Sequence, residues 1–395
     1  MLSKIKYIKI KDILGVIEYT ILFAPSLILK LILAITNKKV WLVAELKDTC
    51  RDNGYHFFKF VKEKHPEQIC FYAIDKKSKD YDKIKHFSGV IQFGSIVYWL
   101  LYLSANKNIV TDKGSDPCHM LFSILHKVGL YDNVVFLQHG VISNIIPMFF
   151  YKNTHFRLMT SGSKLEYELL RSQYYGYPEN RIKYTGLARY DNLMHYNKKE
   201  NQILIMPTWR RWIGRESNIL EKKKPFTESC YYKKWSHLLN NKEFIKYIEQ
   251  NNLIIKFFPH HQMQKFLESF KTTSKNIGIL SEKDNNVQTL LKESALLITD
   301  YSSVVYDFAY MRKPVLYYQF DFDEFMSKHF QDDRIDYIKN GYGDVCKTEE
   351  DLIKHIINFN EDFKLSEKYK KRINMVFVFH DDKNCERIFN EIMKI

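Results

Sequence analysis

Residues 295–321 read ALLITDYSSVVYDFAYMRKPVLYYQFD, and this stretch decides the fold class. The apolar run at 295–298 predicts a short strand buried on both faces of a parallel sheet. After a polar turn, the apolar spacing of residues 304–309 predicts a helix, which a Lys-Pro pair ends before a second strand at 315–318. The order of strand, turn, helix and strand predicts a doubly wound α/β fold, in which ligands bind where strands end and helices begin.

The polar turn at 299–303 is a candidate anion site. Backbone N–H groups at the start of a helix favour negative charge, and Ser302 and Ser303 add hydroxyl donors, with Thr299 beside them. Asp307, one turn later, is a candidate partner for ribose hydroxyls. Two plainer interpretations stay open: the hydroxyls only cap a helix, and Asp307 only complements the helix dipole.

Composition bounds the class of protein. A chain of 395 residues with 45% hydrophobic and 27% charged residues predicts two globular domains and an additional segment. The formal net charge of +14 favours anionic partners such as phosphorylated substrates, acidic lipid or nucleic acid. The six cysteines are scattered without a Cys-x-x-Cys pair, which favours free thiols in a reducing compartment over disulfides or a zinc site.

The first 39 residues differ from the rest of the chain. A lysine cluster precedes the mostly apolar stretch 13–35, which is about long enough to span a bilayer. Because this stretch contains Glu18, Pro25 and Lys30, we expect two short helices lying on the membrane surface. A spanning helix and a soluble core helix are the alternatives, and no cleavable signal is evident.

Alternating strand and helix patterns predict a first α/β domain over 40–195 and a second over 200–375, followed by a C-terminal helix at 376–395. The polar segment 193–202 is the expected linker, and the charged stretch 211–234 is expected to be a loop. Further strands are predicted at 40–44, 68–74, 108–111, 134–137, 203–206 and 253–258.

Polar motifs follow four of these strands: QHG at 138–140, PTWR at 207–210, PHH at 259–261 and TDYSS at 299–303. Carboxyl ends of parallel strands line ligand sites, so we expect these motifs to hold the chemistry. His139 is a candidate general base, while His260, Lys256 and Arg210 are candidate contacts of a diphosphate. Plainer alternatives stay open for three of them: His139 as a buried or turn histidine, His260 as a surface histidine, and Arg210 as part of a solvated charged face.

Taken together, these motifs resemble the CDP-glycerol glycerophosphotransferase family, which includes teichoic acid primases and polymerases and related capsule polymerases. The resemblance covers roughly residues 40–390. It includes the four motifs, the TDYSS motif extended to TDYSSVVYDFAYMRKPVLYY at 299–318, together with AELKDTCRDNGYHFFKF at 44–60, GLARYD at 186–191 and HDDKNCERI at 380–388.

The resemblance implies a GT-B-like fold of two Rossmann-like domains, the first for the acceptor and the second for the CDP-activated donor. It implies that His139 and His260 match the family's two important histidines, that Ser302 and Ser303 face the diphosphate, and that neither a metal nor another cofactor is needed. The expected partners are CDP-glycerol or CDP-ribitol, a lipid-linked saccharide or polymer acceptor, and an anionic membrane surface. The expected location is peripheral, on the cytoplasmic face of a bacterial cell membrane.

Two other functions are weighed against the glycerophosphotransferase function that the resemblance implies. A GT-B glycosyltransferase that uses a nucleotide-sugar explains two domains and a phosphate turn, but explains the motif set less well. A nucleic-acid-binding protein explains the positive charge, but the sequence has no recognisable binding module, so no nucleic-acid partner is expected. The sequence leaves open glycerol against ribitol, primase against polymerase, the acceptor, and whether the chain forms a homo-oligomer.

Overall fold

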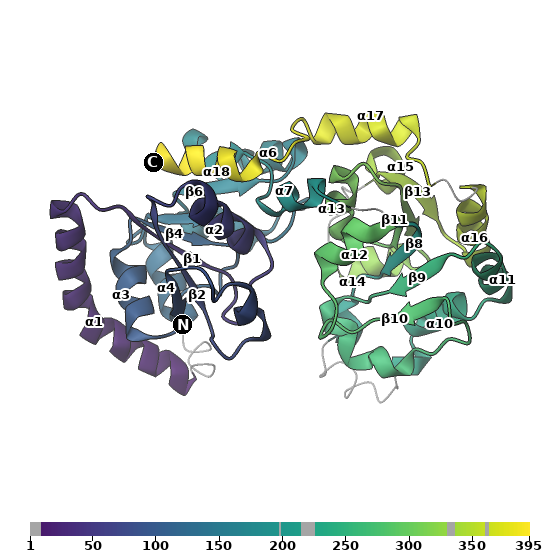
Figure 1. Cartoon of the computed structure of the whole chain (residues 1–395), viewed down its shortest axis with the longest axis horizontal. Helices are drawn as coiled ribbons and strands as arrows, with labels where there is room; N and C mark the ends of the chain where they lie inside the picture. The colour runs from purple at the N-terminus through teal and green to yellow at the C-terminus, as the bar shows by residue number, and fades with distance from the viewer. Residues whose placement is uncertain (1–8, 197–198, 215–225, 330–335, 360–362) are drawn as a thin grey trace. The chain divides into compact units, whose positions relative to one another are not determined.

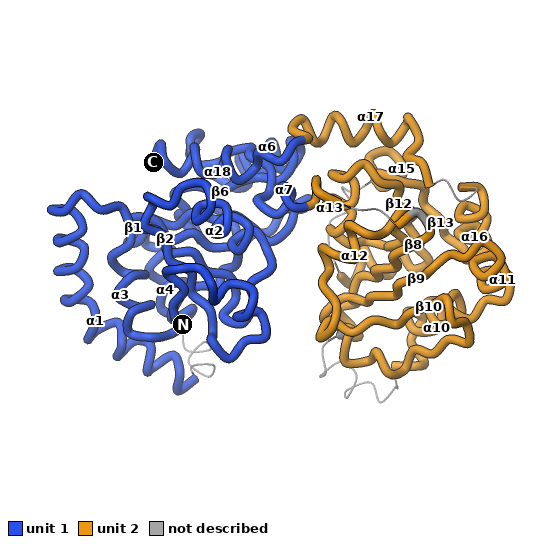
Figure 2. The backbone as a smooth tube through the Cα atoms, in the orientation of Figure 1, with its two compact units in different colours: residues 1–192, 381–395 blue, residues 193–380 orange. Residues whose placement is uncertain are grey.

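The computed structural model describes residues 9–196, 199–214, 226–329, 336–359 and 363–395. These residues form two compact units, residues 1–192 with 381–395 and residues 193–380 (Figure 2). Each unit is built on one parallel sheet with helices packed on it, which confirms the predicted doubly wound α/β class.

The sheet of unit 1 has the strand order β3-β2-β1-β4-β5-β6-β7, and all neighbouring strands are parallel. The order reverses between β1 and β4, so the carboxyl ends of these two strands flank the switch point where such sheets bind ligands. The strands are β1 (Val40–Ala44), β2 (Ile69–Ile74), β3 (Val90–Gln92), β4 (Lys107–Val110), β5 (Val134–Phe136), β6 (Leu158–Ser161) and β7 (Ile182–Tyr184).

Alternation along β1 divides the core of unit 1 between two faces. Trp41 and Val43 pack with helix α2 and the C-terminal helix α18, while Leu42 packs with α3 and α4 on the opposite face. The helical segments are α1 (Ile10–Ile35), α2 (Asn53–Lys64), η2 (Lys79–Lys83), α3 (Ile96–Ser104), α4 (His119–Lys127), η3 (Pro147–Phe149), α5 (Tyr151–Thr154), α6 (Lys164–Leu170), η4 (Glu179–Arg181), α7 (Arg189–Met194), which runs into unit 2, and α18 (Asn384–Met393).

Helix α1 is continuous, which corrects the expectation of two short helices. Pro25 lies inside it, and Figure 1 shows the helix bent part-way along its length but not interrupted. The helix lies beside α3 and α4, and Tyr19, Leu22 and Leu33 pack on the core there. Among the described residues it is the one helix that is long and apolar enough to cross a membrane.

The sheet of unit 2 is also parallel, in the order β10-β9-β8-β11-β12-β13. Its order reverses between β8 and β11, so the PTWR and TDYSS motifs follow the two strands at the switch point. The strands are β8 (Lys199–Met206), β9 (Ile254–Phe257), β10 (Ile277–Ile279), β11 (Ser294–Thr299), β12 (Val315–Tyr318) and β13 (Gly343–Cys346).

The stretch 211–234, expected to be a loop, is partly helical: α8 and η5 lie within it and α10 begins in it, while residues 215–225 lie outside the described part. The expected linker is shorter than 193–202, because β8 already begins at Lys199. The helical segments of unit 2 are α8 (Arg211–Gly214), η5 (Phe226–Glu228), α10 (Cys230–Leu239), α11 (Lys242–Gln250), η6 (His261–Ser269), α12 (Val287–Glu293), α13 (Val304–Tyr310), α14 (Phe322–Lys328), α15 (Tyr337–Asn340), α16 (Glu349–Asn358) and α17 (Glu367–Val376).

The C-terminal helix α18 belongs to unit 1, although it follows unit 2 in the sequence. The Asp191 carboxylate accepts hydrogen bonds from the backbone N–H groups of Asn384 and Cys385, each at 2.8 Å. Gly186 lies at φ +76°, and a side chain there would collide with Asn384. The GLARYD and HDDKNCERI motifs therefore contact each other where α18 packs on unit 1.

Candidate active site

In unit 1, the QHG motif forms a strained turn directly after β5. Gln138 has φ +63°, a conformation that costs energy for a residue other than glycine and that occurs often at functional sites. Its side chain is buried and donates a hydrogen bond to the carbonyl of Thr160. The turn brings the next residue, His139, to the surface.

The ring of His139 is 59% exposed, and one of its nitrogens faces the end of β4. Nδ1 lies 3.3 Å from the carbonyl oxygen of Thr111 and 3.9 Å from Oδ2 of Asp112. Oδ1 of Asp112 accepts the N–H of Gly114 at 2.8 Å, which orients this carboxylate. Since a carbonyl only accepts, Nδ1 is the donor of this contact, and in the neutral ring Nε2 then has the lone pair.

Two further side chains hold the backbone of this turn through its carbonyl groups. Asn53 donates to the carbonyl of Gln138 at 2.8 Å, and Arg189 donates to the carbonyl of His139 at 2.9 Å. Arg189 is in turn paired with Asp52 at 2.8 Å. These bonds offset the strain at Gln138 and keep His139 in one position.

Two fully buried carboxyls accept backbone N–H groups close to the turn. Glu45 accepts from Arg51, Asp52 and Tyr55, and burial, with the charge of Asp52, raises the pKa of Glu45 to about 7. Glu166 accepts from Ile142 and Gly162, and burial raises its pKa to about 8. These carboxyls pin the loops that surround His139.

In unit 2, Arg210 lies at the centre of the switch point and is fully enclosed. Its guanidinium pairs with Asp300 at 2.9 Å and with Asp321 at 2.8 Å, and it also donates to the carbonyl of Thr208. The exposed fractions of these three charged side chains are 0%, 0% and 5%. Asp300 also accepts the backbone N–H groups of Thr208 and Tyr301, so the cluster joins the loop after β8 to the turn after β11.

Three residues predicted to contact the CDP-activated substrate are buried in this structure. The guanidinium N–H groups of Arg210 are directed to Asp300, Asp321 and the carbonyl of Thr208 inside the unit, so in this conformation they are not available to a diphosphate. The hydroxyl of Thr299 is buried and donates to the carbonyl of Met206 at 2.7 Å. Asp307 is 4% exposed, on the inward side of α13. These residues shape the switch point, and sequence alone did not separate them from surface contacts.

His260, by contrast, lies partly exposed next to this cluster. Its Nδ1 accepts the backbone N–H of Gln262 at 3.1 Å, so the ring carries its proton on Nε2. Burial, with the charge of His261, lowers the pKa of His260 to about 4. Near neutral pH the ring is therefore a neutral hydrogen-bond donor.

The ring of Trp209 lies between two histidines. It is nearly parallel to His260, at 6.1 Å between ring centroids, and meets His329 edge-on at 4.8 Å. His329 is buried and accepts the backbone N–H of Arg211 at 3.1 Å. Burial and the charge of Arg210 lower the pKa of His329 to about 3, so it too is neutral.

The remaining predicted donor contacts are accessible. Ser302 is half-buried and Ser303 is exposed at the start of α13, and Lys256 is half-buried on β9. Nδ1 of His261, the neighbour of His260, lies 2.7 Å from Oε2 of Glu282. This pairing favours His260 over His261 as the ring available to a ligand.

The motif set and the two switch points agree with a comparison against known families. The sequence profile described as CDP-Glycerol:Poly(glycerophosphate) glycerophosphotransferase matches residues 26–394. The chain belongs to this family. This membership confirms the resemblance predicted from the motifs.

Two curated relatives are named for teichoic acid synthesis. The minor teichoic acid biosynthesis protein GgaB of Bacillus subtilis (strain 168) is 33% identical over 367 residues, which are 91% of this chain and 40% of GgaB. The teichoic acid poly(glycerol phosphate) polymerase of Bacillus spizizenii is 23% identical over 345 residues, 80% of this chain and 82% of the polymerase. The chain thus spans less than half of GgaB and most of the polymerase.

Solved structures confirm the GT-B-like fold. The wall teichoic acid polymerase TagF matches with a TM-score of 0.66 and 17% identity, over 98% of both chains. A TagF variant soaked with CDPG matches with a TM-score of 0.62 at the same identity and coverage. At this identity the likeness establishes the fold.

Several residues of the site were not singled out from the sequence. Glu45, Asp52, Asn53 and Arg189 lie within motifs that carried the resemblance, but nothing in the motifs indicated that they hold the His139 turn. Asp112 had no signal beyond its place after a predicted strand. Its role depends on strands β4 and β5 being neighbours, which only the sheet order establishes.

Proposed function

We propose that this enzyme transfers an alditol phosphate, with glycerol phosphate favoured, from a CDP-activated donor to a hydroxyl of a lipid-linked or polymeric acceptor. The acceptor oxygen attacks the β-phosphorus and forms a new P–O bond. The bond from that phosphorus to the oxygen shared with the α-phosphate breaks, and CMP leaves with the electron pair. The attacking hydroxyl loses its proton to Nε2 of His139.

The observation that carries the proposal is the family match over residues 26–394 together with the geometry of His139. A general base needs a lone pair that a substrate can reach. The proton on Nδ1 is directed to Thr111, the turn is held by Asn53 and Arg189, and the ring is exposed. Asp112 is then a positioning residue that acts through the ring.

The donor diphosphate is assigned to the accessible residues of unit 2. The Nε2–H of neutral His260 donates to a phosphate oxygen, and Lys256 and the hydroxyls of Ser302 and Ser303 offset the remaining charge. Arg210 holds the two loops of the switch point in place and does not touch the donor. TagF, which has the same fold, was soaked with CDPG, and this supports CDP-glycerol as the donor.

The test is release of CMP by purified protein given CDP-glycerol or CDP-ribitol and a lipid-linked saccharide acceptor in detergent. We expect CMP with CDP-glycerol and a fall of about 10²–10⁴-fold in His139→Ala, because a positioned base contributes that much. Full turnover in a folded His139→Ala protein would remove the base assignment. Release of UDP from a nucleotide-sugar, without CMP from either CDP donor, would favour the glycosyltransferase alternative.

We further propose that α1 lays unit 1 on the surface of an anionic membrane, on its cytoplasmic side. A folded soluble domain rarely exposes so many apolar side chains on one helix. The exposed apolar residues of α1 are Ile10, Ile13, Leu14, Val16, Ile17, Ile21, Phe23, Leu27, Ile28, Leu31, Ile32 and Ile35. The net charge of +14 adds attraction to acidic lipid.

Co-sedimentation with vesicles tests this proposal. The double change Ile17→Asp and Ile28→Asp should release the protein from vesicles that contain acidic lipid, because both side chains are exposed on α1. Ile338→Asp is the matched control, since Ile338 is 67% exposed on α15 of unit 2. Equal binding by both variants would contradict a membrane contact through α1.

A further inference from the structure

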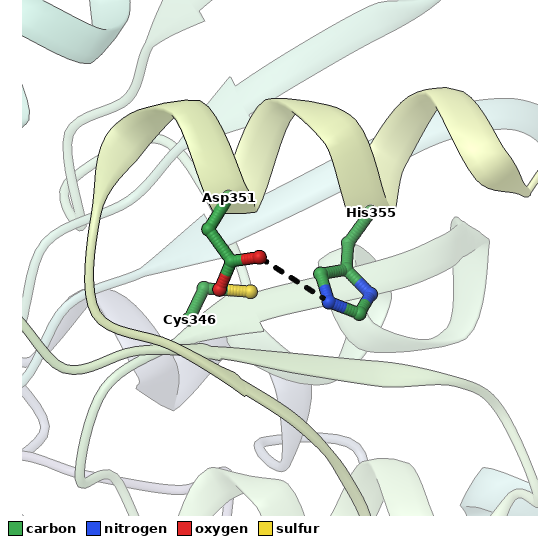
Figure 3. Close-up of side chains that lie close together, drawn as sticks. All are labelled: Cys346, Asp351 and His355. Carbon is green, nitrogen blue, oxygen red and sulfur yellow. Dashed lines mark ion pairs between the residues drawn. The ribbon is translucent and has the colours of Figure 1, made fainter.

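A cluster of three metal-ligating side chains lies in unit 2, outside the residues assigned to transfer chemistry. It consists of Cys346, Asp351 and His355, whose ligand atoms all lie within 4.8 Å of one another. Figure 3 shows Asp351 and His355 on the same face of one helix, with the sulfur of Cys346 beside them. The sequence indicated no zinc motif because Cys346 has no second cysteine nearby.

The local fold brings these side chains together for simple reasons. Cys346 is the last residue of β13, and α16 begins at Glu349 and packs on that strand. Thr348 caps the helix by accepting the N–H of Asp351 at 3.2 Å, which fixes the first turn. Asp351 and His355 are four residues apart, so they project from the same face, as pairs of metal ligands on helices do.

A fourth residue, Asp344, lies beside the histidine. Asp344 is two residues before Cys346 and so lies on the same face of β13. Its Oδ2 is 3.9 Å from Nδ1 of His355, while Nε2 of His355 is 3.6 Å from Oδ1 of Asp351. Asp344 is itself held by the hydroxyl of Tyr369. A carboxylate behind a histidine whose other nitrogen faces the ligands is the usual outer arrangement at zinc sites.

We propose that Cys346, Asp351 and His355 bind one Zn²⁺ ion, with water as the fourth ligand. Thiolate, imidazole and carboxylate are the ligands zinc takes, at bond lengths that separate tetrahedral ligand atoms by about 3.3–3.7 Å. The pair of Asp351 and His355 is already at 3.6 Å, and these side chains are 44% and 33% exposed, so small rotations close the site around an entering ion. Cys346 is buried, so its sulfur is the fixed ligand atom of the site.

The ion would join the edge strand β13 to the helix that covers it. This role is independent of the transfer reaction, since none of the three ligands belongs to the proposed donor or acceptor residues. The competing arrangement is a hydrogen bond from the thiol of Cys346 to the carboxylate of Asp351, with no ion.

Cobalt substitution distinguishes the two arrangements. Tag-free full-length protein, stripped with chelator and reduced, is titrated with Co²⁺, which gives a thiolate-to-cobalt absorption band when a cysteine is a ligand. We expect one equivalent of Co²⁺ to produce the band, Zn²⁺ to displace it, and Cys346→Ser to abolish it. The matched control is Cys230→Ser, because Cys230 is an exposed thiol of the same unit and should leave the band unchanged.

Variants of the exposed ligands keep the test decisive if Cys346→Ser does not fold. His355→Gln should weaken Zn²⁺ binding at least 100-fold, and Asp344→Asn about 10–100-fold through orientation of the ring. Zinc should raise the melting temperature of the wild type but not that of His355→Gln. Absence of the cobalt band in the folded wild type, or its loss in Cys230→Ser, would overturn the proposal.

Discussion

Replacement of Arg210 by Met is the sharpest test of how unit 2 is built. The guanidinium is 0% exposed, between Asp300 and Asp321, and its central carbon lies 4.9–5.2 Å from the ring centroids of Phe325, Tyr301 and Tyr231. Removal of the cation leaves two carboxylates buried together without a counter-ion. Loss of one partner of a buried ion pair costs about 3–5 kcal/mol, so we expect about 4 kcal/mol. For a unit of this size that lowers the melting temperature by about 10 °C.

The assay is calorimetric unfolding of the Arg210→Met variant beside the wild type. Arg211→Met is the matched control, because the side chain of Arg211 is exposed, and its effect should stay within about 0.5 kcal/mol. The triple variant Arg210→Met, Asp300→Asn, Asp321→Asn removes all three charges. The amide oxygen introduced by Asp300→Asn would still accept the N–H groups that Asp300 now accepts, so at least half of the lost stability should return.

The triple variant also separates positioning from substrate contact. If Arg210 only positions the loops, the refolded triple variant regains part of the CMP release; if Arg210 clamps the diphosphate, stability returns and activity does not. A loss below about 1 kcal/mol in Arg210→Met would refute the argument that this cation balances two buried carboxylates.

Asp112, Gly186 and His260 each give a further test. Asp112→Asn should lower kcat by about 3- to 30-fold with KM for CDP-glycerol unchanged, since it only orients the base; an unchanged kcat would exclude this role. Gly186→Ala should destabilise the protein by more than about 2 kcal/mol in urea unfolding, because φ is +76° and the new Cβ would lie 1.8 Å from Oδ1 of Asn384. The control is Gly176→Ala, which has φ +66° and open space around the new Cβ, so it measures the backbone cost alone. Equal losses of stability in the two variants would contradict the steric argument. Burial lowers the pKa of His260 to about 4 from an ordinary value of 6.5, so its neutral form contributes stability above pH 6.5 that is lost as the pH falls toward 4. In thermal melts, His260→Gln should therefore lose less stability than the wild type between about pH 7 and about pH 5. Equal losses in the two proteins would count against this.

Local patterns were enough to predict the strands and the class of fold. Apolar runs such as 40–44 and 315–318 became β1 and β12 with the same bounds, because a strand buried on both faces must be apolar at every position. The same patterns misjudged α1 at Pro25. A proline removes one hydrogen bond from a helix, and the remaining bonds on both sides kept the helix continuous, with a bend.

The sequence by itself determined the chemical types at the site: histidines, hydroxyls and cations after strand ends, in an order that identifies the family. Only the tertiary structure decided which of them are enclosed and which are accessible. Arg210 and His260 are both polar residues that follow a strand, yet one is enclosed by two carboxylates and the other is partly exposed. That difference depends on Asp321, which is far from Arg210 in sequence and reaches it only because β8, β11 and β12 are adjacent in the sheet. Burial and charge pairing depend on neighbours that are distant in the sequence, so no local pattern encodes them.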